Sequence, residues 1–177
     1  MVCVLRDMMP SGVKLVFVGE AVGDESAYAG HYYASARNVF WRHLRESGLT
    51  RIELTPELDH ELPKCGMGLT DIVKCLTNSQ LKQQDKSGAI SPDHWRQWVC
   101  DLERRLKDVA PRAVCFNGKG VARRVLRSGC EWCKQKQEWA NAQIWVVPSS
   151  SPRASRWHPM RLEILNELAR DLGKRDC

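Results

Sequence analysis

Lys14-Leu15-Val16-Phe17-Val18 is a short apolar run, rich in β-branched residues, that ends at Gly19. Its length and composition predict a strand that is buried on both faces. Apolar runs at residues 68–73, 113–116 and 144–147 predict three more strands, and helical patterns separate them. Strands that alternate with helices indicate a parallel sheet with helices on both faces. The sequence therefore predicts an α/β protein: a three-layer α/β/α sandwich around a central four-stranded parallel sheet.

Local signals place several helices between these strands. Asn38 can cap a helix that stops near Gly48, and Ser91-Pro92 supplies an N-cap and a first-turn proline for a longer helix. Behind that proline, apolar residues recur at helical spacing and predict a core-facing stripe: Trp95, Trp98, Val99, Leu102, Leu106 and Val109. Further helices are expected at residues 118–126 and 160–172, and loops without regular structure at residues 19–36, 52–64 and 77–88.

Length and composition predict a single domain over residues 1–177, since 177 residues with 43% hydrophobic content suffice for one core. The formal net charge of +6 is compatible with a polyanionic partner. No stretch approaches the about 20 apolar residues of a membrane span. Arg6 and Asp7 would interrupt a secretory signal, so we expect an intracellular protein with no membrane partner and reduced cysteines.

Ligands of open α/β sheets bind at the carboxyl ends of the strands. That rule selects four loops here: residues 19–23 onward, 70–71, 117–119 and 148–153. Together they supply carboxylates, an amide, hydroxyls, cations and glycine-exposed backbone N–H groups. The residues alone therefore predict a nucleotide or nucleic-acid ligand at this edge of the sheet.

The same loops resemble a known family. Residues 30–41, Gly-His-Tyr-Tyr-Ala-Ser-Ala-Arg-Asn-Val-Phe-Trp, are similar to the signature of the mismatch-specific uracil- and thymine-DNA glycosylases. So are residues 68–73, 116–119 and 148–153, and all four motifs stand in the family's order within residues 13–172. The resemblance implies a monomeric, cofactor-free enzyme that flips uracil out of DNA. It hydrolyses the N-glycosidic bond and leaves abasic-site DNA.

The resemblance also assigns roles to single residues. Tyr33 matches the aromatic residue on which the flipped base stacks, and Arg153 matches the residue that fills the vacated position in the helix. Uracil contacts are further implied for Gly19, Ala21, Val22, Asp71 and Ser149. DNA contacts are implied for Ser150, Ser151, Pro152, Asn117, Lys119 and Arg156. Asn117 equally suits a role in holding a loop, and the two cations equally suit solvated surface positions.

The first loop departs from the family pattern. Relatives read Gly-Ile-Asn-Pro-Gly, and the asparagine positions the attacking water, whereas this chain has Ala21 at that position. The loop is also similar to the Gly-Glu-Ala-Pro-Gly form of iron–sulfur uracil glycosylases. Only Cys3 stands near the amino terminus, where that group has a Cys-x-x-Cys pair, so neither a cluster nor a metal is expected. For positioning the water we rank Glu20 and Asp24 above Asp71, which can also accept the N3–H of uracil.

Three other functions remain open from the sequence. One is a glycosylase for another deaminated base such as hypoxanthine. A second is a non-catalytic protein that binds lesion or abasic-site DNA, which the alanine at position 21 favours. A third is a small nucleotide-binding α/β protein without a DNA partner.

Overall fold

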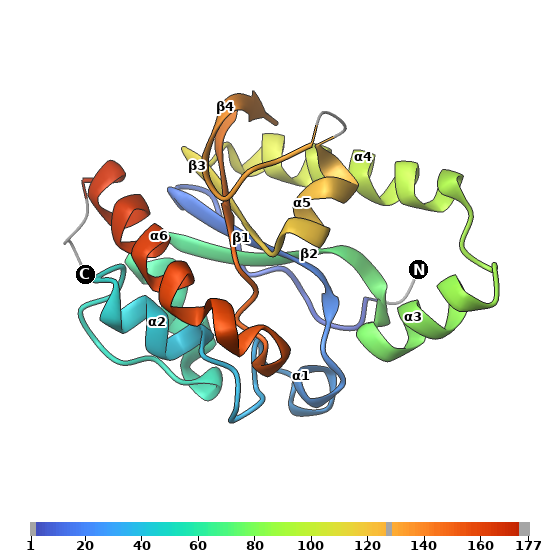
Figure 1. Ribbon diagram of the computed structural model, residues 1–177, viewed down its shortest axis with the longest axis horizontal. Helices are drawn as coiled ribbons and strands as arrows, with labels where there is room; N and C mark the ends of the chain where they lie inside the picture. Colours follow the sequence, from blue (N-terminus) through green and yellow to red (C-terminus); the bar gives the residue numbers. More distant parts are fainter. Residues whose placement is uncertain (1–2, 127–128, 174–177) are drawn as a thin grey trace.

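The computed structural model describes residues 3–126 and 129–173, and its centre is a five-stranded sheet with the order β2-β1-β3-β5-β4 (Figure 1). Four of these strands run parallel to one another: β1 (Leu15–Val22), β2 (Met67–Thr77), β3 (Ala113–Asn117) and β5 (Ala142–Val147). They are the strands that the apolar runs predict, which confirms the α/β fold class.

The fifth strand, β4 (Cys133–Trp139), pairs antiparallel with β5 at the edge of the sheet. The sequence analysis does not predict it. Its central residues are Lys-Gln-Lys-Gln-Glu, and this polar composition lacks the apolar signal of the inner strands. An edge strand that is half open to solvent can form from such residues because only one of its sides must pair.

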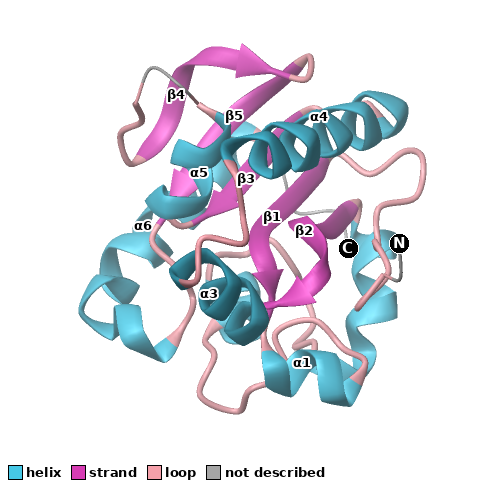
Figure 2. Cartoon of the chain, turned by 90° about the vertical axis from the view of Figure 1, so that its right-hand side faces the viewer, coloured by secondary structure: helices cyan, strands magenta, loops and turns pink. Residues whose placement is uncertain are grey.

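Helices cover both faces of the sheet. One layer consists of α2 (Phe40–Glu46), the 3₁₀ segment η1 (Pro56–Cys65) and α6 (His158–Asp171), and these pack on a core that includes Leu15 and Phe17. The opposite layer consists of α3 (Asn78–Lys86), α4 (Pro92–Val109) and α5 (Lys119–Val125), and it packs on a second core around Val16 and Val18. Figure 2 shows this second layer in front of the strands. Alternate residues of one strand thus feed two cores, as the three-layer prediction requires.

The predicted loop at residues 77–88 is wrong, because α3 occupies most of it. Thr77 accepts a hydrogen bond from the Gln80 backbone N–H, and the Gln80 side chain accepts one from the Thr77 N–H. This reciprocal cap stabilises a helix that buries only Leu81. A single apolar residue gives no periodicity, so the sequence pattern does not reveal the helix.

Two other connections contain regular structure where loops were expected. Residues 52–64 include most of η1, and residues 19–36 contain the end of β1 and α1 (Asp24–Ala29). Glu20, Ala21 and Val22 therefore lie on a strand rather than in a loop. No helix of the described residues combines the length and the apolar character that crossing a bilayer requires.

Candidate active site

Asp71 and Gly19 stand side by side on neighbouring parallel strands, β2 and β1. The Asp71 side chain is almost fully enclosed, with 4% of the residue exposed. A methyl group at position 19 would overlap Oδ1 of Asp71, so the close approach of the carboxyl group requires glycine there. Oδ2 of Asp71 is buried and has no hydrogen-bond partner among the described residues. A carboxyl oxygen in this state has unmet hydrogen-bonding capacity.

Burial raises the pKa of Asp71 to about 6, and Asp7 contributes in the same direction. Lys74 and Arg105 oppose the rise. Both cations are held by Asp7, each at 2.8 Å, and Arg105 also donates to the main-chain oxygen of Asp71 at 3.1 Å. At neutral pH the carboxyl group is therefore mostly ionised and still more basic than an ordinary aspartate. This is the state that suits a general base.

Tyr33 lies near this carboxylate. Its half-buried ring stacks on Phe40, with ring centroids 3.8 Å apart and an interplanar angle of 16°. Burial and the negative charge of Asp71 raise the pKa of the Tyr33 hydroxyl, and the nearby side chain of Asn117 opposes the rise. The backbone of Tyr33 has φ of 53°, a conformation that non-glycine residues adopt rarely and that surrounding contacts must hold. The structure thus brings Tyr33, from the connection between α1 and α2, close to Asp71 on β2 and to Asn117 at the end of β3.

Asn117 also fixes the serine loop that follows β5. Its Oδ1 accepts from the backbone N–H of Ser150 at 3.1 Å, and its Nδ2 donates to the Ser150 hydroxyl at 3.1 Å. The main-chain oxygen of Ser150 accepts from the backbone N–H of Val39 at 3.2 Å. Val39 lies six residues after Tyr33 in the same connection between α1 and α2. Ser150 is fully buried, so in this arrangement neither Asn117 nor Ser150 offers a side chain to a DNA backbone. Of the roles that the sequence left open for Asn117, holding a loop is the one that the geometry shows.

Ser149 is half-buried and stands at the tip of this loop, next to Gly118. Its hydroxyl accepts from the backbone N–H of Ser151 at 3.2 Å. Ser151 in turn caps the 3₁₀ segment η2 (Pro152–Trp157), where its hydroxyl accepts from the N–H of Arg153. Arg153 is exposed beyond this cap. The loop therefore presents an arginine to solvent from a backbone that several hydrogen bonds hold in place.

The two carboxylates ranked first from the sequence are both engaged elsewhere. Asp24 accepts from Thr77 Oγ1 at 2.6 Å and from Ser79 Oγ at 2.5 Å, and these bonds lower the pKa of its exposed carboxyl group. Glu20 pairs with Arg124 on α5 at 3.2 Å. Hydrogen bonds to its ionised form make Asp24 a weaker base, and Glu20 already has an ion-pair partner, so we carry Asp71 forward as the candidate base.

Ala21 and Val22 are buried, with 5% and 4% of each residue exposed. The main-chain oxygen of Ala21 accepts a hydrogen bond from Nδ2 of Asn78 on α3 at 2.9 Å, so this carbonyl group already has a partner. Neither residue presents a polar side chain. Any contact with a base would be made through the backbone or by van der Waals packing.

Sequence reasoning missed Arg161, which lies under the serine loop and is fully buried. Its Nη1 donates to Asn117 Oδ1 at 2.8 Å and to the main-chain oxygen of Pro148 at 2.6 Å. Nε and Nη2 have no hydrogen-bond partner among the described residues, and burial lowers the pKa of the guanidinium to about 10. The signal was present: Arg161 precedes Leu165 by four residues and Leu168 by seven, which places it on the buried face of α6.

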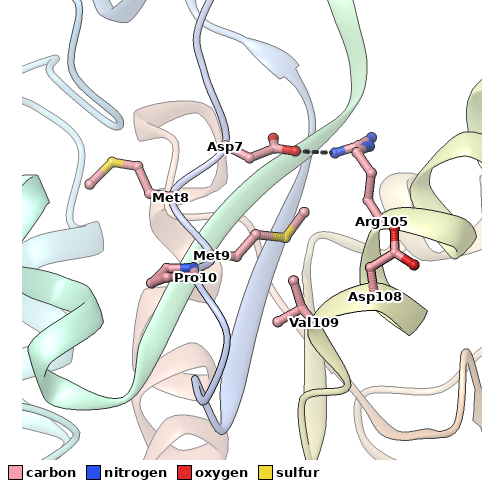
Figure 3. A pocket seen from close by; sticks show the side chains of 7 residues that line it. All are labelled: Asp7, Met8, Met9, Pro10, Arg105, Asp108 and Val109. Atoms are coloured by element: carbon pink, nitrogen blue, oxygen red, sulfur yellow. Dashed lines mark hydrogen bonds and ion pairs between the residues drawn. The ribbon is translucent and has the colours of Figure 1, made fainter.

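A groove of about 430 Å³ lies outside this site. Figure 3 shows its lining, with the Asp7–Arg105 ion pair at one end. Pro10 and Val109, which also line it, precede the amino ends of β1 and β3. Because α/β sheets bind ligands at the opposite, carboxyl edge, we assign the site to the Asp71 region.

These features define a class of protein: an α/β sandwich with a stacked tyrosine and a hydrogen-bonded serine loop at the carboxyl edge of a parallel sheet. Beside them lies a buried carboxyl group with one oxygen that has no partner among the described residues. A family model for the uracil DNA glycosylase superfamily matches residues 7–173, so the chain belongs to that superfamily. Membership supports a DNA glycosylase and DNA as its partner. The fold is also similar to the solution NMR structure of a Methanosarcina acetivorans protein provisionally named a uracil DNA glycosylase. The TM-score is 0.64 at 20% identity, over 96% of this chain and 97% of the other.

Proposed function

We propose that this protein is a monofunctional uracil-DNA glycosylase that flips uracil out of DNA and hydrolyses its N-glycosidic bond, leaving an abasic site. The observation that carries the proposal is the buried carboxyl group of Asp71, which has one oxygen without a partner among the described residues and a pKa near 6. It lies beside Tyr33, whose ring is the stacking surface for the extruded base.

In the proposed reaction the Asp71 carboxylate accepts a proton from a water molecule. The water oxygen bonds to C1′ of the sugar, and the electrons of the C1′–N1 bond leave with uracil. The sugar acquires cationic character as this bond lengthens, so the negative charge of Asp71 stabilises the transition state as well. One positioned base supplies typically about 10²–10⁴ of the rate, and fixed dipoles and charges supply much of the rest.

Arg161 is well placed to help the leaving group. Its charge is buried beneath the serine loop and forms no ion pair with a carboxylate among the described residues. A buried cation without a counter-ion favours any negative charge that develops nearby, because the low dielectric of the interior screens it weakly. Uracil leaves as an anion, and the hydroxyl and N–H groups of Ser149 can donate to its carbonyl oxygens.

The experiment is to incubate the protein with a single-uracil oligonucleotide and measure alkali-labile breaks under single-turnover conditions. We expect breaks at the uracil with wild type. For Asp71→Asn we expect the rate to fall by about a hundredfold or more. Asp24→Asn and Glu20→Gln are matched controls, since each removes one carboxylate of the same sheet edge, and both should keep nearly the full rate. No breaks with wild type, or a full rate with Asp71→Asn, would overturn the proposal.

Two parallel substrates separate the alternatives. A hypoxanthine-containing strand that reacts faster than the uracil strand would identify the protein as a glycosylase for that base. Tight binding to abasic-site DNA without base release from any strand would identify a non-catalytic binding protein, in which Ala21 marks the loss of hydrolysis.

A further inference from the structure

Two tryptophans meet beside the serine loop. Trp132 lies in the connection before β4, and Trp157 ends η2; their ring centroids are 6.5 Å apart at an angle of 41°. Trp132 is half-buried and packs against both cores, whereas Trp157 is one of the exposed large hydrophobic residues, with 37% of its surface open. The core thus holds one indole, and the other is presented to solvent. Neither has a role in the site described above.

A cation lies over each of these rings. Nζ of Lys119 is 4.7 Å from the Trp132 centroid, and the guanidinium carbon of Arg156 is 5.1 Å from the Trp157 centroid. We call these four residues the aromatic-basic surface. Aromatic rings interleaved with cations are the chemistry that binds single-stranded nucleic acid: bases stack on the rings, and phosphates pair with the cations.

The aromatic-basic surface is continuous with the candidate active site. Lys119 begins α5 two residues after Asn117, and Cys133, next to Trp132, pairs with Val146 near the carboxyl end of β5. Trp157 follows Arg153 by four residues on η2. Ala154 departs from helical backbone angles between them, so Arg153 and Trp157 lie on either side of a kink in η2.

We propose that the aromatic-basic surface docks unpaired nucleotides that flank the flipped base, so that the protein takes single-stranded DNA in preference to duplex. The proposal rests on the proposed function for the position of the flipped base. A stacking indole needs a base with a free face. In a duplex, neighbouring base pairs cover both faces of each internal base. The aromatic-basic surface therefore binds unpaired strands in preference to duplex DNA.

Glu131 bears on the same surface. Its side chain is 90% exposed and its Oε2 lies 3.1 Å from Nζ of Lys119. A phosphate that pairs with Lys119 must displace this carboxylate. Glu131 therefore weakens strand binding at this position, and its removal is a test that increases binding instead of destroying it.

The first experiment measures the affinity for a uracil-free single strand and for a uracil-free hairpin duplex of the same sequence by fluorescence anisotropy. We expect Trp157→Ala to weaken single-strand binding by about tenfold and to leave duplex binding nearly unchanged. Trp157→Phe should retain most of the affinity because it keeps an aromatic face. Equal affinities of wild type and Trp157→Ala for the single strand would overturn the proposal.

The second experiment uses Glu131→Gln, a change at an exposed residue that leaves the fold intact. We expect single-strand binding to tighten by about threefold or more, with a salt slope steeper by about 0.7. Glu103→Gln is the matched control: Glu103 pairs with Lys107 at 2.7 Å on α4, so this variant frees a lysine and changes the net charge equally. An equal gain in both variants would show an effect of net charge alone and would overturn the proposal.

These tests are independent of hydrolysis, because no strand in them contains uracil. If Trp157→Ala loses single-strand affinity while wild type releases no uracil, the proposed function fails and the surface stands. If wild type releases uracil and Trp157→Ala binds normally, the surface fails and the proposed function stands.

Discussion

Asp71, Asp24 and Glu20 carry the same functional group near one edge of the sheet, and their surroundings give the three carboxylates different chemistry. Asp24 accepts two hydroxyl hydrogen bonds, which favour its ionised form. Glu20 is paired with an arginine. Only Asp71 is both buried and left with a free oxygen among the described residues. Residue type alone does not distinguish a base from a structural acid, but the environment of each carboxylate does.

The pH dependence of the reaction follows from this environment. Asp71 acts as a base only when ionised, and its pKa is raised to about 6. We expect the single-turnover rate of uracil release to be level above about pH 7 and to fall about tenfold per pH unit well below pH 6. Asp24→Asn should give the same profile. A rate that stays constant from pH 5 to about pH 8 would show that the reaction does not depend on the ionisation of Asp71.

The same carboxyl group links stability to pH. Its pKa is about 6 in the folded protein against an ordinary value of 3.8, so the folded state binds more protons between these two pH values. The contribution of Asp71 to stability is therefore most favourable at low pH and is lost as the pH rises through 6. We expect Asp71→Asn to gain about 2–3 kcal/mol relative to wild type between pH 4 and pH 7.5, measured by urea unfolding. Parallel pH curves for the two proteins would contradict this.

At the scale of elements, the site depends on how β3, the serine loop and α6 are joined. Asn117 ends β3, Ser150 lies in the loop, and Arg161 comes from the second turn of α6. The side-chain amide of Asn117 forms two hydrogen bonds with Ser150 and one with Arg161, and these hold both residues in place. The loop after β5 therefore has the order of a core element although it lies at the sheet edge.

This arrangement predicts opposite results for two substitutions at one position. Asn117→Ala leaves the buried N–H of Ser150 and one N–H of Arg161 without acceptors, so we expect a loss of about 2–4 kcal/mol in unfolding free energy. Asn117→Asp keeps both acceptor contacts and supplies a counter-ion to the buried guanidinium. It should unfold at a denaturant concentration close to or above that of wild type. Similar losses for both variants would mean that packing, and not hydrogen bonding, holds the loop.

At the scale of the whole molecule, the net charge of +6 acts together with the placement of cations at one sheet edge. Arg153, Arg156 and Lys119 all lie in segments that follow β3 or β5. Under the proposed function, charge on this edge attracts the DNA backbone from a distance, and the buried carboxylate acts only on the base that has entered.

Binding to DNA should therefore weaken steeply with salt. With three phosphate contacts we expect a slope of log K against log salt of about −2 for a single strand and nearer −3 for a duplex. Arg153→Ala should make the slope shallower by about 0.7 for the single strand. The measurement is a salt titration of uracil-free oligonucleotide binding. A slope near zero would indicate a nucleotide-binding protein with no DNA partner.

The sequence by itself determined the fold class and the family, because apolar runs and capping residues are local signals and the four motifs stand in a fixed order. It also predicts that the site lies at the carboxyl edge of the sheet. Only the tertiary structure decided which of the three acids is buried with an unpartnered oxygen among the described residues. Burial, pairing and the contact between Gly19 and Asp71 depend on the register of distant strands. The polar residues of β4 and α3 likewise give no apolar pattern. For Arg161 the helical spacing indicates the buried face of α6, but its hydrogen-bond partners come from distant segments.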